Sequence, residues 1–195
     1  YARKRELKPA RKHGQLLSDL FGVDKSHFAT HLTTINLATR DLIDAENYPQ
    51  IARSDFFDVE AGRAFLTLPS RAEAESLGRI QRRELRVPPL DAGVGNPPYV
   101  RQEDIPRARR TGRPGPEHGT KDYYRRLVLK ESGAKLSGRS DIHCYFWPHA
   151  TSFLNDDGYL CLLTSSQWLD VEYGFRLQEW ILKNFEIVAV FESID

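Results

Sequence analysis

Apolar residues along the chain follow two alternating patterns. Short, nearly unbroken apolar runs have the length of buried strands and occupy residues 20–23, 48–52, 90–94, 159–164 and 187–191. Between several of these runs, apolar residues recur every three or four positions, as they do on one face of a helix. An alternation of strands and helices is typical of an α/β protein with a parallel sheet. We therefore expect a doubly wound, Rossmann-like sheet that binds its ligands at the carboxyl ends of the strands.

Capping and breaking residues set the ends of the expected helices. Ser26 is the predicted N-cap of the first helix, and Ser140 that of a later helix, which Pro148 should kink or whose start it should shift. A charged stretch over residues 71–85 predicts a surface helix, and residues 155–158 predict a turn. The apolar positions expected on the faces of the first and the last helix are Phe28, Leu32, Ile35 and Leu42, and Leu177, Trp180 and Ile181.

The composition is that of a globular protein. The 195 residues are 40% hydrophobic and 28% charged, and no apolar run approaches the roughly 20 residues of a membrane helix. The chain starts at Tyr1 and contains no Met, so we expect it to be a piece of a longer protein. Its two cysteines, Cys144 and Cys161, are too few for a disulfide framework or a cysteine zinc site, and they suit a reducing cytoplasm.

The net charge of +1 conceals a basic segment. Residues 101–139 hold eleven Lys or Arg against five Asp or Glu, together with several glycines and prolines. These features predict a long, mobile, basic loop at about residues 101–139. Such a loop suits the phosphate backbone of a nucleic acid, but a solvated surface insertion has the same composition, and charge alone leaves both possibilities open.

Three polar residues come just after predicted strands. These residues are Asp24, Asp55 and Asn96. Because the carboxyl ends of parallel strands meet at one edge of a sheet, we expect the three side chains to outline a binding site. The alternative for Asp24 is a loop or helix-capping carboxylate, and for Asp55 or its neighbour Asp58 it is a solvated carboxylate.

The strongest chemical signal is the segment Asn96-Pro97-Pro98-Tyr99, which follows a predicted strand. Two successive prolines fix the backbone and carry no N–H group, so the turn is rigid and offers carbonyl oxygens without competing donors. Together with such a carbonyl, the side-chain oxygen of Asn96 gives two acceptors for one amino group. The ring of Tyr99 can stack on a planar heterocycle.

Such a site answers a difficulty of adenine chemistry. The exocyclic amine of adenine is a poor nucleophile because its lone pair is delocalised into the ring, and acceptors for both amine hydrogens favour a pyramidal nitrogen. Attack of that nitrogen on a sulfonium methyl group needs orientation and charge stabilisation more than a dedicated base. A base within a duplex must first be flipped out of the stack.

The tetrapeptide resembles the catalytic motif of amino-group methyltransferases that use S-adenosylmethionine, above all the DNA adenine-N6 methyltransferases. Residues 100–103, 140–146, 164–169 and 173–174 are similar to the methylase portion of type II, type IIG-like restriction-modification enzymes. The resemblance extends from about Leu20 to the end of the chain. It implies a class I methyltransferase fold, double-stranded DNA as substrate and S-adenosylmethionine as cofactor.

The resemblance also implies roles for the four motif residues. Asn96 and the carbonyl of Pro97 would bind the target amine, Pro98 would complete the rigid turn, and Tyr99 would stack on the flipped base. A catalytic site of this kind needs no metal ion.

The cofactor residues implied by the resemblance precede the motif. Asp24 would accept hydrogen bonds from the ribose hydroxyls of the cofactor, Asp55 would contact its adenine amine, and Phe56 would pack on the adenine ring. The sequence lacks the family's glycine-rich cofactor loop, because Gly14 and Gly22 are isolated.

We therefore expect residues 1–195 to be a single incomplete methyltransferase catalytic domain. It would lack the first strand, the last strands and a target recognition domain. We also expect the isolated piece to be inactive and poorly stable. Two alternatives remain open: a methyltransferase acting on RNA bases or protein glutamine amides, and a noncatalytic nucleic-acid-binding remnant. Asp141, His143 and Cys144 are too close in sequence to converge as a nucleophilic site, so we do not assign catalysis to them.

Overall fold

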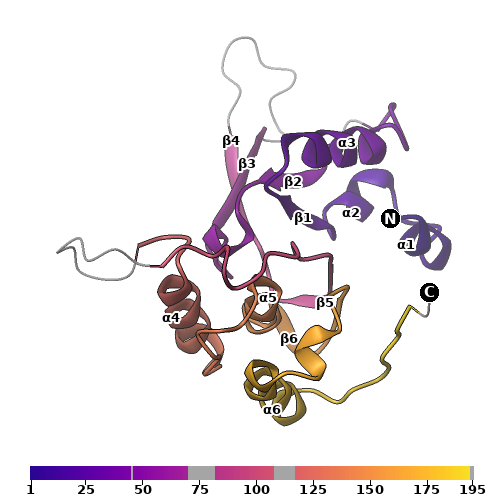
Figure 1. Cartoon of the computed structure of the whole chain (residues 1–195). Coiled ribbons are helices and arrows are strands. Elements are labelled where there is room, and N and C mark those ends of the chain that lie inside the picture. Colours follow the sequence, from indigo (N-terminus) through magenta and orange to yellow (C-terminus); the bar gives the residue numbers. More distant parts are fainter. Residues whose placement is uncertain (45, 70–81, 108–116, 194–195) are drawn as a thin grey trace. The chain divides into compact units, whose positions relative to one another are not determined.

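The computed structural model describes residues 1–44, 46–69, 82–107 and 117–193. The chain forms two compact units, Tyr1–Pro88 and Pro89–Asp195. Figure 1 shows helices and short strands in both units. The helices within the described ranges are all too short or too polar to cross a membrane.

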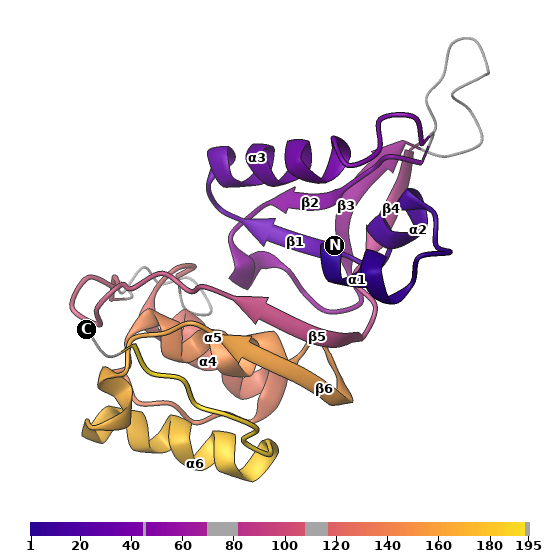
Figure 2. The same cartoon turned by 90° about the vertical axis from the view of Figure 1, so that its right-hand side faces the viewer.

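A parallel strand pair lies at the centre of the first unit. Strands β1 (Phe21–Asp24) and β2 (Gln50–Arg53) pair in parallel over their whole length, and α3 (His27–Ala38) connects them. The helix packs against both strands, as Figure 2 shows. Ser26 is the N-cap of α3 and accepts a hydrogen bond from the Ala29 N–H at 3.4 Å. The strands predicted at this place and the predicted cap are thus confirmed.

The apolar face predicted for α3 is exposed. The side chains of Phe28 and Ile35 are 75% and 58% exposed, while Thr30 is buried and its hydroxyl donates to the carbonyl of Ser26. Leu42 lies beyond the end of the helix. A different face of α3 therefore rests on the strands.

Two short helices precede β1. Helix α1 (Ala2–Leu7) has no buried residue, whereas α2 (His13–Leu17) is mostly buried. The side-chain amide of Gln50 lies within 3.0 to 3.2 Å of three carbonyl oxygens at the end of α2 and just after it, those of Leu17, Ser18 and Leu20. These hydrogen bonds fix the entry to β1 beside the start of β2.

An antiparallel hairpin completes the first unit and corrects one prediction. Strand β3 (Ala64–Pro69) pairs with β4 (Arg82–Arg86). The helix predicted over residues 71–85 is wrong for residues 82–85, because this charged stretch forms ladder hydrogen bonds with β3. The other part of that prediction, residues 71–81, lies outside the described residues.

The second unit contains another parallel pair. Strands β5 (Leu90–Gly95) and β6 (Leu154–Leu162) pair in parallel, which confirms the run at residues 90–94. The strand predicted over residues 159–164 begins and ends earlier than expected. The register shifts between Leu90 and Ala92, so that residues 155–158, predicted as a turn, bulge out of the ladder.

Helices α5 and α6 supply much of the core of the second unit. Helix α5 (Ile142–Thr151) continues through Pro148, and its N-cap is Asp141 rather than the predicted Ser140. Helix α6 (Phe175–Asn184) has the predicted buried face, formed by Leu177, Trp180 and Ile181. The other two tryptophans contact each other, with Trp168 buried and Trp147 half-buried.

Part of the predicted basic loop is helical. Helix α4 (Lys121–Ser132) begins after Thr120, whose hydroxyl accepts a hydrogen bond from the backbone of the first turn. It ends at Gly133, whose φ of 69° is a left-handed conformation that glycine adopts without strain. The prediction of one loop over residues 101–139 is therefore wrong for α4. Residues 108–116 of that loop lie outside the described residues.

Residues 187–191 do not form the predicted fifth strand. This segment is extended, and its side chains are exposed, with Phe191 at 93%. Within the described residues no strand pairs with it, and a strand requires a ladder partner. The structure is thus a mixed α/β protein, as predicted, and the part of the chain that it describes contains two parallel pairs and one antiparallel hairpin. A joined, doubly wound sheet stays a prediction.

Candidate functional site

The Asn96–Tyr99 segment leaves β5 directly at its carboxyl end. Asn96 and Pro98 are exposed, Pro97 is buried, and Tyr99 is 57% exposed. The hydrogen bond from the Leu163 N–H to the carbonyl of Gly95, 2.9 Å long, extends the pairing of β5 and β6 to the start of the segment. The motif therefore lies on a rigid strand end with one proline packed inward and the polar group outward.

The Asn96 and Tyr99 side chains contact each other. The Tyr99 hydroxyl lies 3.1 Å from Asn96 Oδ1 and 3.4 Å from the carbonyl oxygen of Leu163, and its single proton donates to one of them at a time. An amide oxygen has two lone pairs, so Asn96 Oδ1 can accept a second hydrogen bond from a ligand. The pair presents an exposed acceptor next to an exposed aromatic ring.

A buried carboxylate fastens the segment that follows the motif. Asp141 Oδ1 accepts a hydrogen bond from the Gln102 N–H at 2.7 Å, and Asp141 Oδ2 accepts one from the Tyr173 hydroxyl at 2.9 Å. The Ile142 N–H donates to the Val100 carbonyl at 3.1 Å. The three segments named in the resemblance beside the motif, residues 100–103, 140–146 and 173–174, thus form one hydrogen-bonded network.

The role of Asp141 is a feature that sequence reasoning missed. Its position directly before a helix is the one available signal, since aspartate is common at N-caps. In the structure the carboxylate does not cap α5, because both of its oxygens bind other elements. Burial and the hydrogen bond to Asp141 both raise the pKa of Tyr173, so this phenol stays protonated and keeps donating.

His143 and Cys144 lie in the first turn of α5. Both side chains are buried. Burial raises the pKa of the Cys144 thiol to about 12 and lowers the pKa of His143, so each group is neutral near pH 7. A neutral, enclosed thiol is a core residue rather than a nucleophile.

Thiol labelling tests this assignment. At pH 8 we expect an aromatic disulfide reagent to modify Cys161, which is exposed on β6, and to modify Cys144 at least about a hundredfold more slowly. Mass spectrometry of tryptic peptides at timed intervals measures both rates. Equal rates for the two thiols would contradict the buried placement of Cys144.

The three predicted cofactor residues all lie in the first unit, at the carboxyl ends of β1 and β2. The Asp24 carboxylate accepts a hydrogen bond from the Ser26 N–H at 2.6 Å. The Asp55 carboxylate accepts one from the Phe57 N–H at 3.1 Å and pairs with Lys25 at 3.3 Å. The two acidic residues therefore also stabilise their own loops, as the alternative interpretation held for Asp24, whereas the alternative for Asp55 was a solvated carboxylate.

These residues still fit the chemistry of a nucleoside. Asp24 is exposed, and within the described residues its Oδ2 has no hydrogen-bond donor, so it can accept from ribose hydroxyls. Phe56 is half-buried directly after Asp55, and its ring lies 6.2 Å from that of Phe57, measured between ring centroids. The structure places Asp24, Asp55 and Phe56 together in the first unit, and Asn96, Pro97, Pro98 and Tyr99 together in the second.

Curated relatives share the chain's sequence over part of their length. Type II methyltransferase M.XamI of Xanthomonas campestris pv. amaranthicola is 28% identical over 111 residues, which are 55% of this chain and 19% of that protein. Type II methyltransferase M.BstVI of Geobacillus stearothermophilus is 29% identical over 98 residues, 50% of this chain and 15% of that protein. Type II methyltransferase M.XhoI of Xanthomonas vasicola is 23% identical over 209 residues, 100% of this chain and 34% of that protein. The chain spans about a third of these relatives or less.

A family model covers nearly the whole sequence. The model of the Eco57I restriction-modification methylase matches residues 18–193, which include both parallel strand pairs and the Asn96–Tyr99 segment. The chain belongs to the Eco57I restriction-modification methylase family.

Proposed function

We propose that the complete gene product containing this chain methylates the N6 amine of adenine in double-stranded DNA as part of a restriction-modification system. The observation that carries the proposal is the exposed Asn96 oxygen beside the exposed Tyr99 ring at the end of β5. Family membership and the type II methyltransferases among the relatives support a DNA substrate.

In this proposal the motif residues orient the target base. Asn96 Oδ1 and the Pro97 carbonyl accept the two hydrogens of the amine, which localises the nitrogen lone pair for attack. Tyr99 stacks on the flipped base, an interaction of about 1–3 kcal/mol per base. Pro98 carries no N–H that would compete for these acceptors. In this proposal, catalysis depends mainly on the orientation of the target amine by Asn96 and Pro97 and on the stacking of the base on the Tyr99 ring.

The proposal assigns the cofactor to the first unit. S-adenosylmethionine, when bound, supplies an activated methyl group. Asp24 would accept hydrogen bonds from its ribose hydroxyls, Asp55 would hold the adenine amine, and Phe56 would pack on the adenine ring. We further propose a cytoplasmic location, since both Cys144 and Cys161 are free thiols.

Nucleoside analysis tests the proposal. The complete gene product is expressed in a host that lacks its own DNA methyltransferases, and the host DNA is digested and analysed by mass spectrometry. We expect N6-methyladenine above the level of a host with an empty vector. Methylated cytosine alone would overturn the assignment of adenine. Methylation found in RNA or in protein glutamine, with none in DNA, would favour the alternative substrates.

A further inference from the structure

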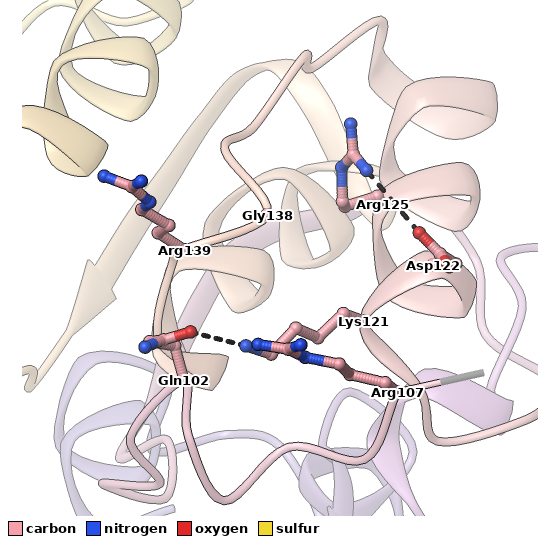
Figure 3. A pocket seen from close by; sticks show the side chains of 7 residues that line it. All are labelled: Gln102, Arg107, Lys121, Asp122, Arg125, Gly138 and Arg139. Carbon is pink, nitrogen blue, oxygen red and sulfur yellow. Dashed lines mark hydrogen bonds and ion pairs between the residues drawn. The ribbon is translucent and has the colours of Figure 1, made fainter. Parts of the chain in front are cut away.

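A cationic cavity lies close to the motif in the second unit. Its volume is about 470 Å³, many times the roughly 30 Å³ that one water occupies in the liquid. It is lined by the segment after Tyr99, by the first turns of α4 and by the segment before α5 (Figure 3). Each of these segments contributes positive charge: Arg107 from the first, Lys121 and Arg125 from the second, and Arg139 from the third.

These cations are poorly neutralised by the protein itself. Asp122 is the carboxylate in the lining and lies 3.5 Å from Arg125. Within the described residues no carboxylate forms an ion pair within 4 Å of Arg107, Lys121 or Arg139. The pKa of the exposed Glu103 is lowered mainly by hydrogen bonds from its own backbone N–H and from Gln102, with a smaller contribution from the charge of Lys121. Like charges around one cavity repel each other, and an anion bound between them would relieve that repulsion. The planar guanidinium groups of arginine match the oxygens of a phosphate.

Of the four cations, Lys121 gives the strongest indication of an anionic ligand. Its residue is only 8% exposed, although a buried ammonium group is costly unless it is well paired. Its Nζ donates to Gln102 Oε1 at 2.5 Å, and Figure 3 shows its side chain extending toward Gln102. An ammonium group has three N–H donors, and Gln102 is a neutral partner for one of them. The remaining donors and the charge suit an anionic ligand.

The cavity is tied to the motif through Gln102. This residue comes three positions after Tyr99, so their Cα atoms lie at most about 10 Å apart. Its N–H is held by the buried Asp141 carboxylate, and its side chain by Lys121. Successive phosphates of a DNA strand rise by about 3.4 Å along the helix axis. A phosphate in the cavity would therefore belong to a nucleotide near the one whose base stacks on Tyr99.

We propose that this cavity binds a backbone phosphate of the DNA strand that carries the target base. The inference rests on the proposed function, which supplies the DNA. A phosphate contact positions the strand without reading its sequence. The cavity thus holds the flanking backbone while the base leaves the duplex, and it governs DNA affinity rather than the methyl transfer itself.

Salt-dependent DNA binding tests the proposal. The Arg107→Gln/Arg139→Gln double variant removes two exposed cations, so folding is unaffected. Binding of a fluorescent 30-base-pair duplex to the complete gene product is measured from 50 to 200 mM salt. The double variant should lose the contact with this one phosphate. Its DNA binding should therefore be about tenfold weaker near 0.1 M salt, and the slope of log K against log salt should be smaller by about 1. Arg126→Gln/Lys130→Gln is the matched control, because both residues are exposed on α4 outside the cavity and the same charge is removed, and it should leave the slope unchanged.

The outcomes separate this proposal from the proposed function. An unchanged slope in the double variant, with N6-methyladenine still formed by the unmodified protein, overturns the cavity's role and leaves the proposed function standing. A reduced slope without any N6-methyladenine from the unmodified protein supports the cavity's role and overturns the adenine assignment. A third arm measures inorganic phosphate binding by calorimetry. Phosphate binding that disappears in the double variant, while DNA affinity is unchanged, identifies a free-anion site and overturns the proposal.

Discussion

Replacing Asn96 by Ala is expected to lower the rate of adenine methylation by about a hundredfold to a thousandfold, the loss seen when one preorganised hydrogen-bonding group leaves a catalytic site. The substitution removes the exposed Oδ1 that would accept from the target amine, and it removes the partner of the Tyr99 hydroxyl. DNA affinity should change by less than about threefold, because phosphate contacts supply most of it. The measurement is single-turnover methyl transfer to DNA by the complete gene product, with the binding constant determined in parallel.

Two control variants separate the possible causes of such a loss. Tyr99→Phe removes the hydroxyl and keeps the ring, so it should cost only a few-fold if Asn96 acts on the substrate directly. Asn155→Ala removes another exposed asparagine of the second unit, whose amide bonds Asp91 at 2.9 Å, and it should leave the rate unchanged. If Asn96→Ala methylated DNA at a rate close to that of Asn155→Ala, the proposed catalytic role of Asn96 would be wrong.

Short strands and the cap of α3 are the features that the sequence could predict. The runs at residues 20–23, 48–52 and 90–94 became strands, because short, nearly unbroken apolar runs bounded by polar residues favour a strand over a helix, although β5 is half-buried or exposed along its length. Ser26 caps α3 because its hydroxyl satisfies a backbone N–H of the first turn, which is a purely local interaction.

The sequence-based predictions are wrong where the structure of a segment depends on contacts with other segments or on local caps. Residues 82–84 are charged, Leu85 alone gives no apolar period, and only the ladder with β3 makes residues 82–85 a strand. Residues 187–191 have a strand-like composition, yet they lack a ladder partner within the described residues. Residues 101–139 as a whole are basic and rich in Gly and Pro, and this average composition conceals the local signals of α4, which are the Thr120 and Gly133 caps.

In the candidate site, too, local features could be predicted from the sequence and long-range contacts could not. The sequence singled out Asn96 and Tyr99, because a rigid turn with acceptors and a ring is a local property of four residues. It did not predict the contact of Asp141 with Gln102 and Tyr173, which joins residues 32 to 39 positions apart. Nor did it predict the cationic cavity, since only the fold brings its three segments together.

Gly174→Ala is expected to destabilise the second unit by about 3–5 kcal/mol, at the upper end of overpacking effects. A Cβ on Gly174 would lie 1.7 Å from the carbonyl oxygen of Trp168 and 2.7 Å from its carbonyl carbon. The obstacle is backbone, and that backbone is fixed, because the Gln178 side-chain amide donates to the Trp168 carbonyl at 3.1 Å. The φ of Gly174 is −75°, so close approach rather than backbone conformation requires glycine here.

Gly138→Ala is the matched control for this prediction. The nearest atom to a Cβ at Gly138 is Arg125 Nη1 at 3.9 Å, an ordinary contact, so stability should change by less than about 1 kcal/mol. Both variants are compared in the complete gene product by thermal unfolding and by hydrogen exchange of peptides that cover residues 165–181. The Gly174 variant should unfold about 10 °C lower and exchange faster in these peptides. The prediction would be contradicted if the Gly174 variant unfolded within 2 °C of the Gly138 variant, a margin of about 1 kcal/mol or less, and its hydrogen exchange were unchanged. The turn between Trp168 and α6 would then adjust to the added methyl group at little cost, and Gly174 would have no packing role.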